Sequence, residues 1–202
     1  MVAKTLKTLG TRFKVQGTPW EPLFMPYHGD EVVSLDCETT GLDPHSDDLL
    51  TLAAVKIRAG KIMTSEKLDL RLPPSPKQAA DSIRIHGIRK VDLKESIPIE
   101  EALPRLLDFV GNRPILGYYI NFDVTLLNRY IREAFGFELP NTTIELADVF
   151  KQKTRQPDTA DLRLERILTQ LNVPTFGRHT AIGDATMVAM AYVKLQKGVG
   201  MA

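Results

Sequence analysis

Two carboxylates lie two residues apart in a stretch that otherwise has the composition of a buried strand. Residues 32–37 are rich in β-branched and apolar side chains, and Asp36 and Glu38 stand at i and i+2, which a strand places on one face. Two ionised groups this close repel each other and resist removal from water, so they need a cation or a large shift in pKa. We therefore expect a metal site, against the alternative of an edge strand whose acids face water.

Two further acids stand at the heads of apolar helix faces. Asp123 begins such a face in a helix expected over 122–135, which Asn121 caps and Gly136 closes, and Asp184 begins another in the last helix. One acid in a first turn needs no function, because it stabilises the helix N-terminus by about 0.3–1 kcal/mol. Two of them, added to a strand with a carboxylate pair, indicate acids that converge at one end of a sheet.

The donor set is suited to hard cations. Four carboxylates and one histidine favour Mg²⁺ or Mn²⁺, whereas a single Cys37 and a single nearby histidine argue against structural zinc. Two such ions about 4 Å apart would stabilise the attacking and leaving oxygens in phosphodiester hydrolysis. His179, in the loop before Asp184, is placed to act as a base, although a lone histidine is more often structural. Arg178 beside it is compatible with a simple surface residue.

The elements that must position these groups alternate between strands and helices. The first three strands should follow one another in antiparallel succession, and a mixed sheet in an α/β sandwich is expected. Strands are predicted at 32–37, 50–57, 61–72, 115–119 and 144–150. Helices are predicted to end near 85–88, to span 99–110 and 122–135, to begin at a cap on Asp161, and to follow the 178–184 loop.

Length and charge limit the number of domains and the kind of surface. At 202 residues, 43% apolar and 25% charged, the chain has the size of one globular domain after an N-terminal extension, residues 1–30. The net charge is only +1, so nucleic-acid contacts must be local. The first 20 residues carry four basic side chains and no acid, Lys4, Lys7, Arg12 and Lys14. This basic arm is suited to phosphate, while a poorly ordered terminus is the alternative.

Targeting signals are missing from the sequence. The N-terminus has no uninterrupted apolar segment and no stretch approaches 18 apolar residues, so we expect a cytoplasmic protein without a membrane partner. The single Cys37 cannot form an internal disulfide, and by alternation it faces away from Asp36 and Glu38 as a small core residue.

Three ordered motifs carry a resemblance to a known family. They are Asp36-Cys-Glu38-Thr-Thr-Gly, Asn121-Phe-Asp123 and His179-Thr-Ala-Ile-Gly-Asp184. They resemble, in order and spacing, those of the DnaQ-like 3′–5′ exonucleases of the DEDDh class, in particular DNA polymerase III epsilon-like members. The similarity covers about residues 31–197, so residues 31–202 would form the exonuclease domain. The resemblance implies a ribonuclease H-like fold with a mixed five-stranded sheet flanked by helices.

The resemblance also implies roles for single residues. Asp36 would contact both of two Mg²⁺ or Mn²⁺ ions, Glu38 and Asp184 would complete the first metal site, and Asp123 would hold the second. His179 would deprotonate the attacking water. The residues that would contact the substrate are Thr39, Thr40, Gly41, Leu42 and His86.

The implied function is a metal-dependent 3′–5′ exonuclease on single-stranded DNA that releases nucleoside 5′-monophosphates in proofreading or repair. An exoribonuclease on RNA or short oligoribonucleotides, and a non-catalytic module that binds a polymerase or nucleic acid, are the alternatives. The segment Tyr118-Tyr119-Ile120-Asn121 departs from the family, in which many members have histidine before the asparagine, and this affects substrate preference. Because the chain ends soon after the last helix, we expect a stand-alone enzyme. A DNA polymerase is a candidate partner, and monomer and homodimer both stay open.

Overall fold

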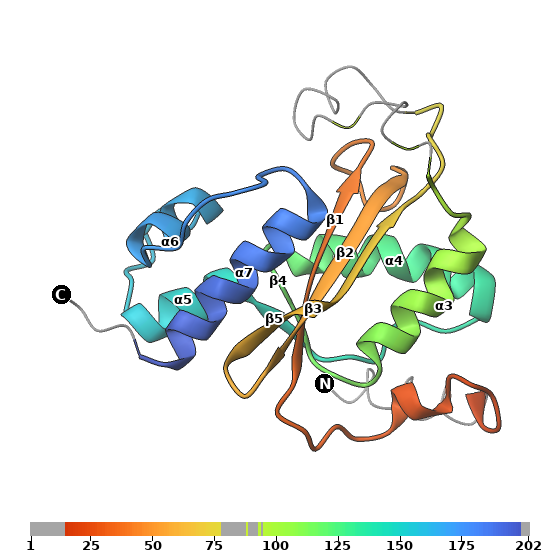
Figure 1. Cartoon of the computed structure of the whole chain (residues 1–202), viewed down its shortest axis with the longest axis horizontal. Coiled ribbons are helices and arrows are strands. Elements are labelled where there is room, and N and C mark those ends of the chain that lie inside the picture. Colours follow the sequence, from red (N-terminus) through yellow and green to blue (C-terminus); the bar gives the residue numbers. More distant parts are fainter. Residues whose placement is uncertain (1–14, 78–87, 89–92, 94, 199–202) are drawn as a thin grey trace.

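A mixed five-stranded sheet forms the centre of the fold, as predicted (Figure 1). The computed structural model describes residues 15–77, 88, 93 and 95–198. The strands are β1 (Val32–Thr39), β2 (Leu49–Arg58), β3 (Lys61–Arg71), β4 (Ile115–Gly117) and β5 (Thr143–Glu145). Their order is β3-β2-β1-β4-β5, with antiparallel pairing from β3 to β1 and parallel pairing from β1 to β5.

Helices cover both faces of this sheet. The helical elements are η1 (Glu21–Phe24), α3 (Ile99–Val110), α4 (Ile120–Phe135), α5 (Leu146–Thr154), α6 (Leu164–Gln170) and α7 (Ala181–Gln196). Figure 1 shows α3 and α4 on one side of the strands and α5, α6 and α7 on the other. Each side has its own buried apolar core, so the protein has the three layers expected of an α/β sandwich.

Successive side chains of β1 point alternately into the two helical layers. Val33 and Leu35 enter the core under α3 and α4. Ser34 is fully buried on the other face, where its hydroxyl donates to the Ala185 carbonyl of α7 at 2.8 Å. A small side chain with a satisfied hydroxyl lets α7 approach β1 closely, which brings Asp184 next to the end of the strand.

The strand predicted at 144–150 is wrong. Only Thr143–Glu145 pairs with β4, and Leu146 begins α5. The Glu145 side chain accepts a hydrogen bond from the Ala147 amide and so caps this helix. A short apolar run does not distinguish a strand from a buried helix turn, and here the cap decides in favour of the helix.

Two predicted helix caps are also wrong. The N-cap of α4 is Tyr119, and Asn121 lies inside the helix. The N-cap of α6 is Arg163, and the Asp161 carboxylate instead accepts from the Arg163 amide in the preceding turn at 3.1 Å. In both cases the cap residue makes no side-chain hydrogen bond to the helix, so the usual cap chemistry gave no signal.

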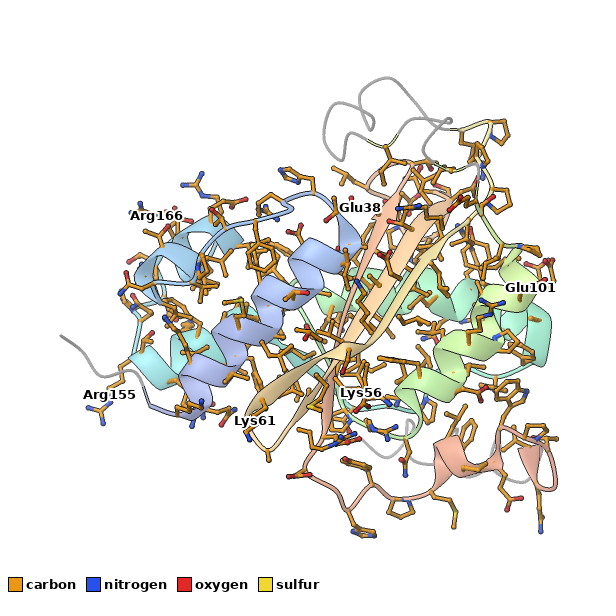
Figure 2. All side chains as sticks on the ribbon, viewed as in Figure 1. Glu38, Lys56, Lys61, Glu101, Arg155 and Arg166 are labelled. Carbon is orange, nitrogen blue, oxygen red and sulfur yellow. The ribbon has the colours of Figure 1, made fainter. Side chains whose placement is uncertain are left out.

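The sheet is open beside the second half of β1. β4 pairs with β1 only at Val33 with Ile115 and Ser34 with Leu116. Beyond this point α4 begins, and Glu38 lies at this end of β1 while Lys61 lies at the opposite end of the sheet (Figure 2). The opening therefore coincides with the carboxyl end of the strand that bears the predicted acids.

Some of the predicted features lie outside the described residues or at the N-terminal end of the chain. The short helix ending near 85–88, His86 and the basic residues of the N-terminal arm lie outside the described residues. Within the described part of the 1–30 segment, Phe24 packs edge-on against Phe137, with 5.5 Å between ring centroids. Among the described helices, none is both long enough and apolar enough to cross a membrane.

Candidate active site

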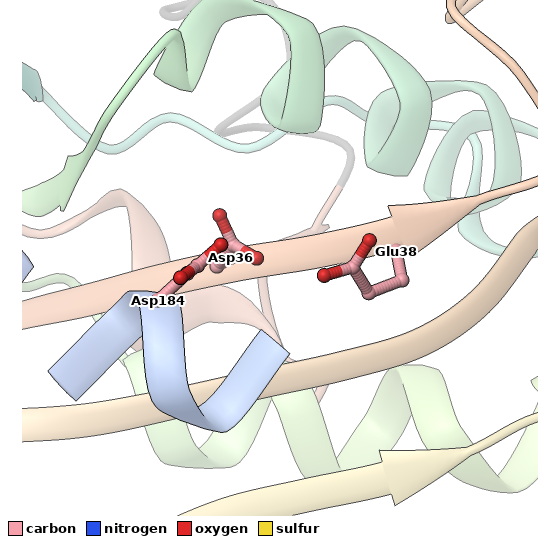
Figure 3. Close-up of side chains that lie close together, drawn as sticks. All are labelled: Asp36, Glu38 and Asp184. Atoms are coloured by element: carbon pink, nitrogen blue, oxygen red, sulfur yellow. The ribbon is translucent and has the colours of Figure 1, made fainter. Parts of the chain in front are cut away.

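Three carboxylates meet at the carboxyl end of β1. Asp36 and Glu38 extend from the strand and Asp184 from the first turn of α7, and one oxygen of each lies within 4.8 Å of the others (Figure 3). Asp184 is only 8% exposed, whereas the two strand acids are partly exposed. The structure thus brings together three of the four acids predicted to bind metal.

The fourth acid, Asp123, reaches the same strand from the opposite layer. It lies in the first turn of α4 and is 4% exposed. Cys37 makes hydrogen bonds to this carboxyl through its thiol and its backbone amide. Burial, the largest cause, raises the pKa of Asp123 despite these bonds. Asp123 lies outside the group of three, but its charge acts on Asp36, so the four acids form one electrostatic unit.

Concentrated negative charge makes this site costly to ionise. Burial, followed by the charges of Asp123, Glu38 and Asp184, raises the pKa of Asp36 well above its usual range. Burial, followed by the charge of Asp184, raises the pKa of Glu38 to about 7. These shifts mean that the protein alone does not stabilise the fully ionised site.

One internal cation partly offsets this repulsion. Arg178 donates to Asp184 Oδ2 from Nη1 at 2.5 Å, and its Nη2 pairs with Glu165 on α6. The same guanidinium lowers the pKa of both Asp36 and Glu38. Arg178 is therefore part of the site, in contrast to the surface position that its sequence context allowed.

The residues present fit a hard divalent cation. Asp184 Oδ1 is buried and has no hydrogen-bond partner among the described residues. An unpaired buried carboxylate oxygen is expensive, and a metal ion would satisfy it. The donors gathered here are carboxylate oxygens, which Mg²⁺ and Mn²⁺ prefer. Asp36, Glu38 and Asp184 would hold one such ion, and Asp123 is suited to a second beside Asp36.

His179 lies in a tightly built turn in front of α7. It is exposed and has a left-handed backbone, with φ of 60°. The next residue, Thr180, is the N-cap, and its hydroxyl accepts from the Gly183 amide while donating to the Gly177 carbonyl. A Cβ at Gly183 would come within 2.1 Å of that carbonyl, so glycine is required where the turn folds onto the helix. The backbone of His179 is thereby fixed two residues before the helix that bears Asp184.

The segment after Glu38 forms a compact loop. Thr39 donates to the Gly41 carbonyl, and Thr40 donates to Asp47. A Cβ on Gly41 would meet the Asp47 carboxylate at 2.6 Å, so glycine permits the close approach of this side chain. Leu42 is 87% exposed at the tip. The loop therefore presents an apolar side chain on a braced backbone next to the acids, while His86 lies outside the described residues.

The sequence of this chain matches a known protein family. The model of a family described as "Exonuclease" matches residues 33–192.

The chain belongs to the exonuclease family.

Its relatives include the DNA polymerase III epsilon subunit of Aquifex aeolicus, 30% identical over 167 residues, which are 81% of this chain and 79% of that protein. The PolC-type DNA polymerase III of Thermotoga petrophila is 30% identical over 84% of this chain, which spans only 12% of that protein. The structure of Escherichia coli exonuclease I with a dT13 oligonucleotide has a TM-score of 0.69, with 19% identity over 83% of this chain and 41% of that chain. This likeness supports the ribonuclease H-like fold predicted from the motifs.

Three residues contribute to the site in ways that the motifs did not predict: Glu165, Arg178 and Cys37. Glu165 holds Arg178 from a helix 13 residues earlier in the chain, and no local spacing connects the two. Cys37 packs against the core, as predicted, but it also interacts with Asp123. The position of Cys37, between two acids on an exposed strand end, was the one signal in the sequence that could have indicated this second role.

Proposed function

We propose that this protein is a metal-dependent 3′–5′ exonuclease that shortens single-stranded DNA and releases nucleoside 5′-monophosphates. The observation that carries the proposal is the meeting of Asp36, Glu38 and Asp184 within 4.8 Å in a chain of the exonuclease family. Clustered acids with raised pKa values at one strand end are typical of a catalytic centre that works with divalent cations.

The residues would divide the work as follows. Asp36, Glu38, Asp184 and Asp123 would hold two Mg²⁺ or Mn²⁺ ions. When bound, these ions would supply stabilisation of the charge on the attacking and leaving oxygens. His179, whose side chain is exposed, would act as the general base and take a proton from the attacking water. Arg178 would partly offset the negative charge of the site.

The loop after Glu38 supports attack at a free strand end. Thr39, Thr40, Gly41 and Leu42 would receive the terminal nucleotide, with Leu42 against its base. Such a contact grips a free end and leaves no room for a strand that continues. DNA is favoured over RNA as the substrate because a structural neighbour was solved in complex with a dT13 oligonucleotide. The epsilon subunit among the relatives makes a replicative DNA polymerase the partner to test.

Four substrates of one sequence test this proposal. Purified protein with Mn²⁺ is given linear single-stranded DNA, the same DNA blocked at the 3′ end, its circular form and the matching RNA. We expect rapid release of nucleoside 5′-monophosphates from the linear DNA only, and no release with Asp36→Asn. Rapid cutting of the circle would contradict the exonuclease assignment, and preference for RNA would replace DNA as the substrate. Binding without cutting in Mn²⁺ and Mg²⁺ would favour the non-catalytic module.

A further inference from the structure

A tyrosine ring is exposed at the start of α4, one helical turn before Asp123. The Tyr119 side chain is 71% exposed, compared with 46% for Phe176, the other large aromatic side chain exposed among the described residues. A single exposed apolar side chain is ordinary on a protein surface, so a function for the ring is inferred from the backbone beneath it. Tyr119 also lies in the segment, residues 118–121, at which this chain departs from the family motif.

The backbone at Tyr119 is in an unfavourable conformation for such a residue. Its φ of 55° and ψ of 35° lie in the left-handed region, which bulky residues avoid. Glycine or asparagine would form this turn at lower cost. A bulky residue with a strained backbone and an exposed ring suggests a function for the ring itself.

Neighbouring groups fix the turn and the ring. Glu145 accepts a hydrogen bond from the Ile120 amide at 3.0 Å and also interacts with the Tyr119 amide. The Tyr119 ring packs edge-on against Tyr118, with 4.8 Å between centroids. Tyr118 is itself anchored, because its hydroxyl donates to the Leu162 carbonyl at 3.2 Å. The exposed face of Tyr119 is therefore held in a rigid position.

Electrostatic contacts connect this ring pair to the acidic cluster. The charges of Glu145 and Glu165 both act on Tyr118. Glu165 pairs with Arg178, which in turn pairs with Asp184. Tyr118, against which the Tyr119 ring packs, therefore lies near the contacts that join Glu165, Arg178 and Asp184.

We propose that Tyr119 is a stacking platform for one unpaired base of the single-stranded DNA substrate, close to the bond that is cut. The inference rests on the proposed function and adds a substrate contact to it. An aromatic face accepts every base, so the contact would bind without reading sequence, with purines held more tightly than pyrimidines because they offer more surface. Tyr119 would position substrate and take no part in proton transfer.

Binding of labelled oligonucleotides tests the contact apart from turnover. The probe is a 12-nucleotide single-stranded DNA with a 5′ fluorophore, measured by anisotropy in EDTA. A set of four further probes carries an abasic nucleotide at each of the last four positions. We expect Tyr119→Ala to weaken binding of the intact probe by about 5- to 150-fold, the usual range for loss of one stacked base. Tyr119→Trp should restore binding, and Met25→Ala, which removes an exposed side chain near η1, should leave it unchanged.

Two results would be specific for stacking. The difference between wild type and Tyr119→Ala should disappear for the abasic probe that lacks the contacted base. Tyr119→Gly should lose binding while its melting temperature holds or rises, because glycine adopts this backbone without strain. Equal binding by wild type and Tyr119→Ala, or an equal loss with all the abasic probes, would overturn the inference. If wild type degrades DNA in Mn²⁺ and Tyr119→Ala binds normally, only this contact fails. If wild type neither binds nor degrades the probe, the proposed function fails with it.

Discussion

The guanidinium of Arg178 donates to the Asp184 carboxylate at 2.5 Å, at the point where three acids of the candidate active site meet. Arg178 is held from behind by Glu165, so its position does not depend on Asp184 alone. The protein thus carries its own positive charge beside a site built to bind cations. This charge stabilises the acids without a metal, and it also repels any metal that binds.

Replacing this arginine should separate the two effects. We expect Arg178→Met to lower the melting temperature in EDTA, because the acids lose their internal cation. At pH 8, where the acids ionise more fully, the variant should bind Mn²⁺ about tenfold more tightly, since a charge repulsion of about 1.4 kcal/mol is removed. Isothermal titration calorimetry and thermal melts with and without metal measure both quantities.

Arg166→Met is the matched control. Arg166 lies on α6, exposed and directed away from the site, where it pairs with Asp161 at 3.7 Å (Figure 2). Its loss should change neither quantity. Weaker Mn²⁺ binding by Arg178→Met would mean that the arginine mainly orients Asp184 for the metal.

Asp36 should be essential for activity and dispensable for folding. Asp36→Asn removes the acid that feels the charges of the other three, so hydrolysis should be abolished. The melting temperature in EDTA should hold or rise, because the repulsion within the site falls. Nucleotide release and thermal melting on the same preparation provide the measurements. Activity near that of wild type would remove Asp36 from the mechanism.

The stability of the metal-free protein should depend on Glu38 and pH. The folded state raises the pKa of Glu38 from 4.5 to about 7, so between these values it holds a proton that the unfolded chain has released. Folding stability from this group therefore falls as the pH rises through that window. Glu38→Gln should gain melting temperature relative to wild type from pH 4.5 to 7 in EDTA.

Glu101→Gln on the exposed face of α3 serves as the comparison, because Glu101 lies far from the acids and pairs only with Arg105 among the contacts described (Figure 2). Its difference from wild type should not follow the same pH window. An identical pH dependence for wild type and Glu38→Gln would show that burial does not shift this carboxyl.

Replacement of His179 should lower the rate of hydrolysis and leave metal binding unchanged. General-base catalysis typically contributes about 10²–10⁴-fold, so His179→Ala should lose about that much turnover. The rise in melting temperature on adding Mn²⁺ should match that of wild type, since the acids are intact, whereas Asp184→Asn should lose it. Metal affinity that falls in proportion to rate would make His179 a ligand and not the base.

The parts of the fold that depend on local periodicity could be predicted from the sequence. β1, β2, β3 and α3 have the predicted bounds to within two residues, because alternation and helical spacing both act within one element. The 144–150 segment was misassigned because its apolar run suits either structure. The decisive group, the Glu145 side chain, acts by capping a helix that starts one residue later.

The acids of the site could be predicted from the sequence, but the residues that surround and pair with them could not. Motif spacing indicated Asp36, Glu38, Asp123 and Asp184, and the structure brings the first two together with Asp184. The pairing of Arg178 with Glu165 arises from the packing of α6 against α7, which no spacing in the chain encodes. The same holds for Tyr119, whose exposure and backbone conformation are properties of the folded turn.

The shortness of β4 limits how this protein can vary. If β4 ran beside β1 for two more residues, it would add hydrogen bonds, which is normally harmless in a sheet. Here its backbone would occupy the start of α4, the helix that bears Asp123. Gly117 is part of the same arrangement, since a Cβ there would meet Ile120 Cδ1 at 2.6 Å just where the chain turns into the helix. Insertions here would break the site without touching a single acid. Gly117, which has no chemistry of its own, should therefore be as intolerant of change as the metal-binding residues, and a survey of random variants should find inactive, well-folded proteins at this position.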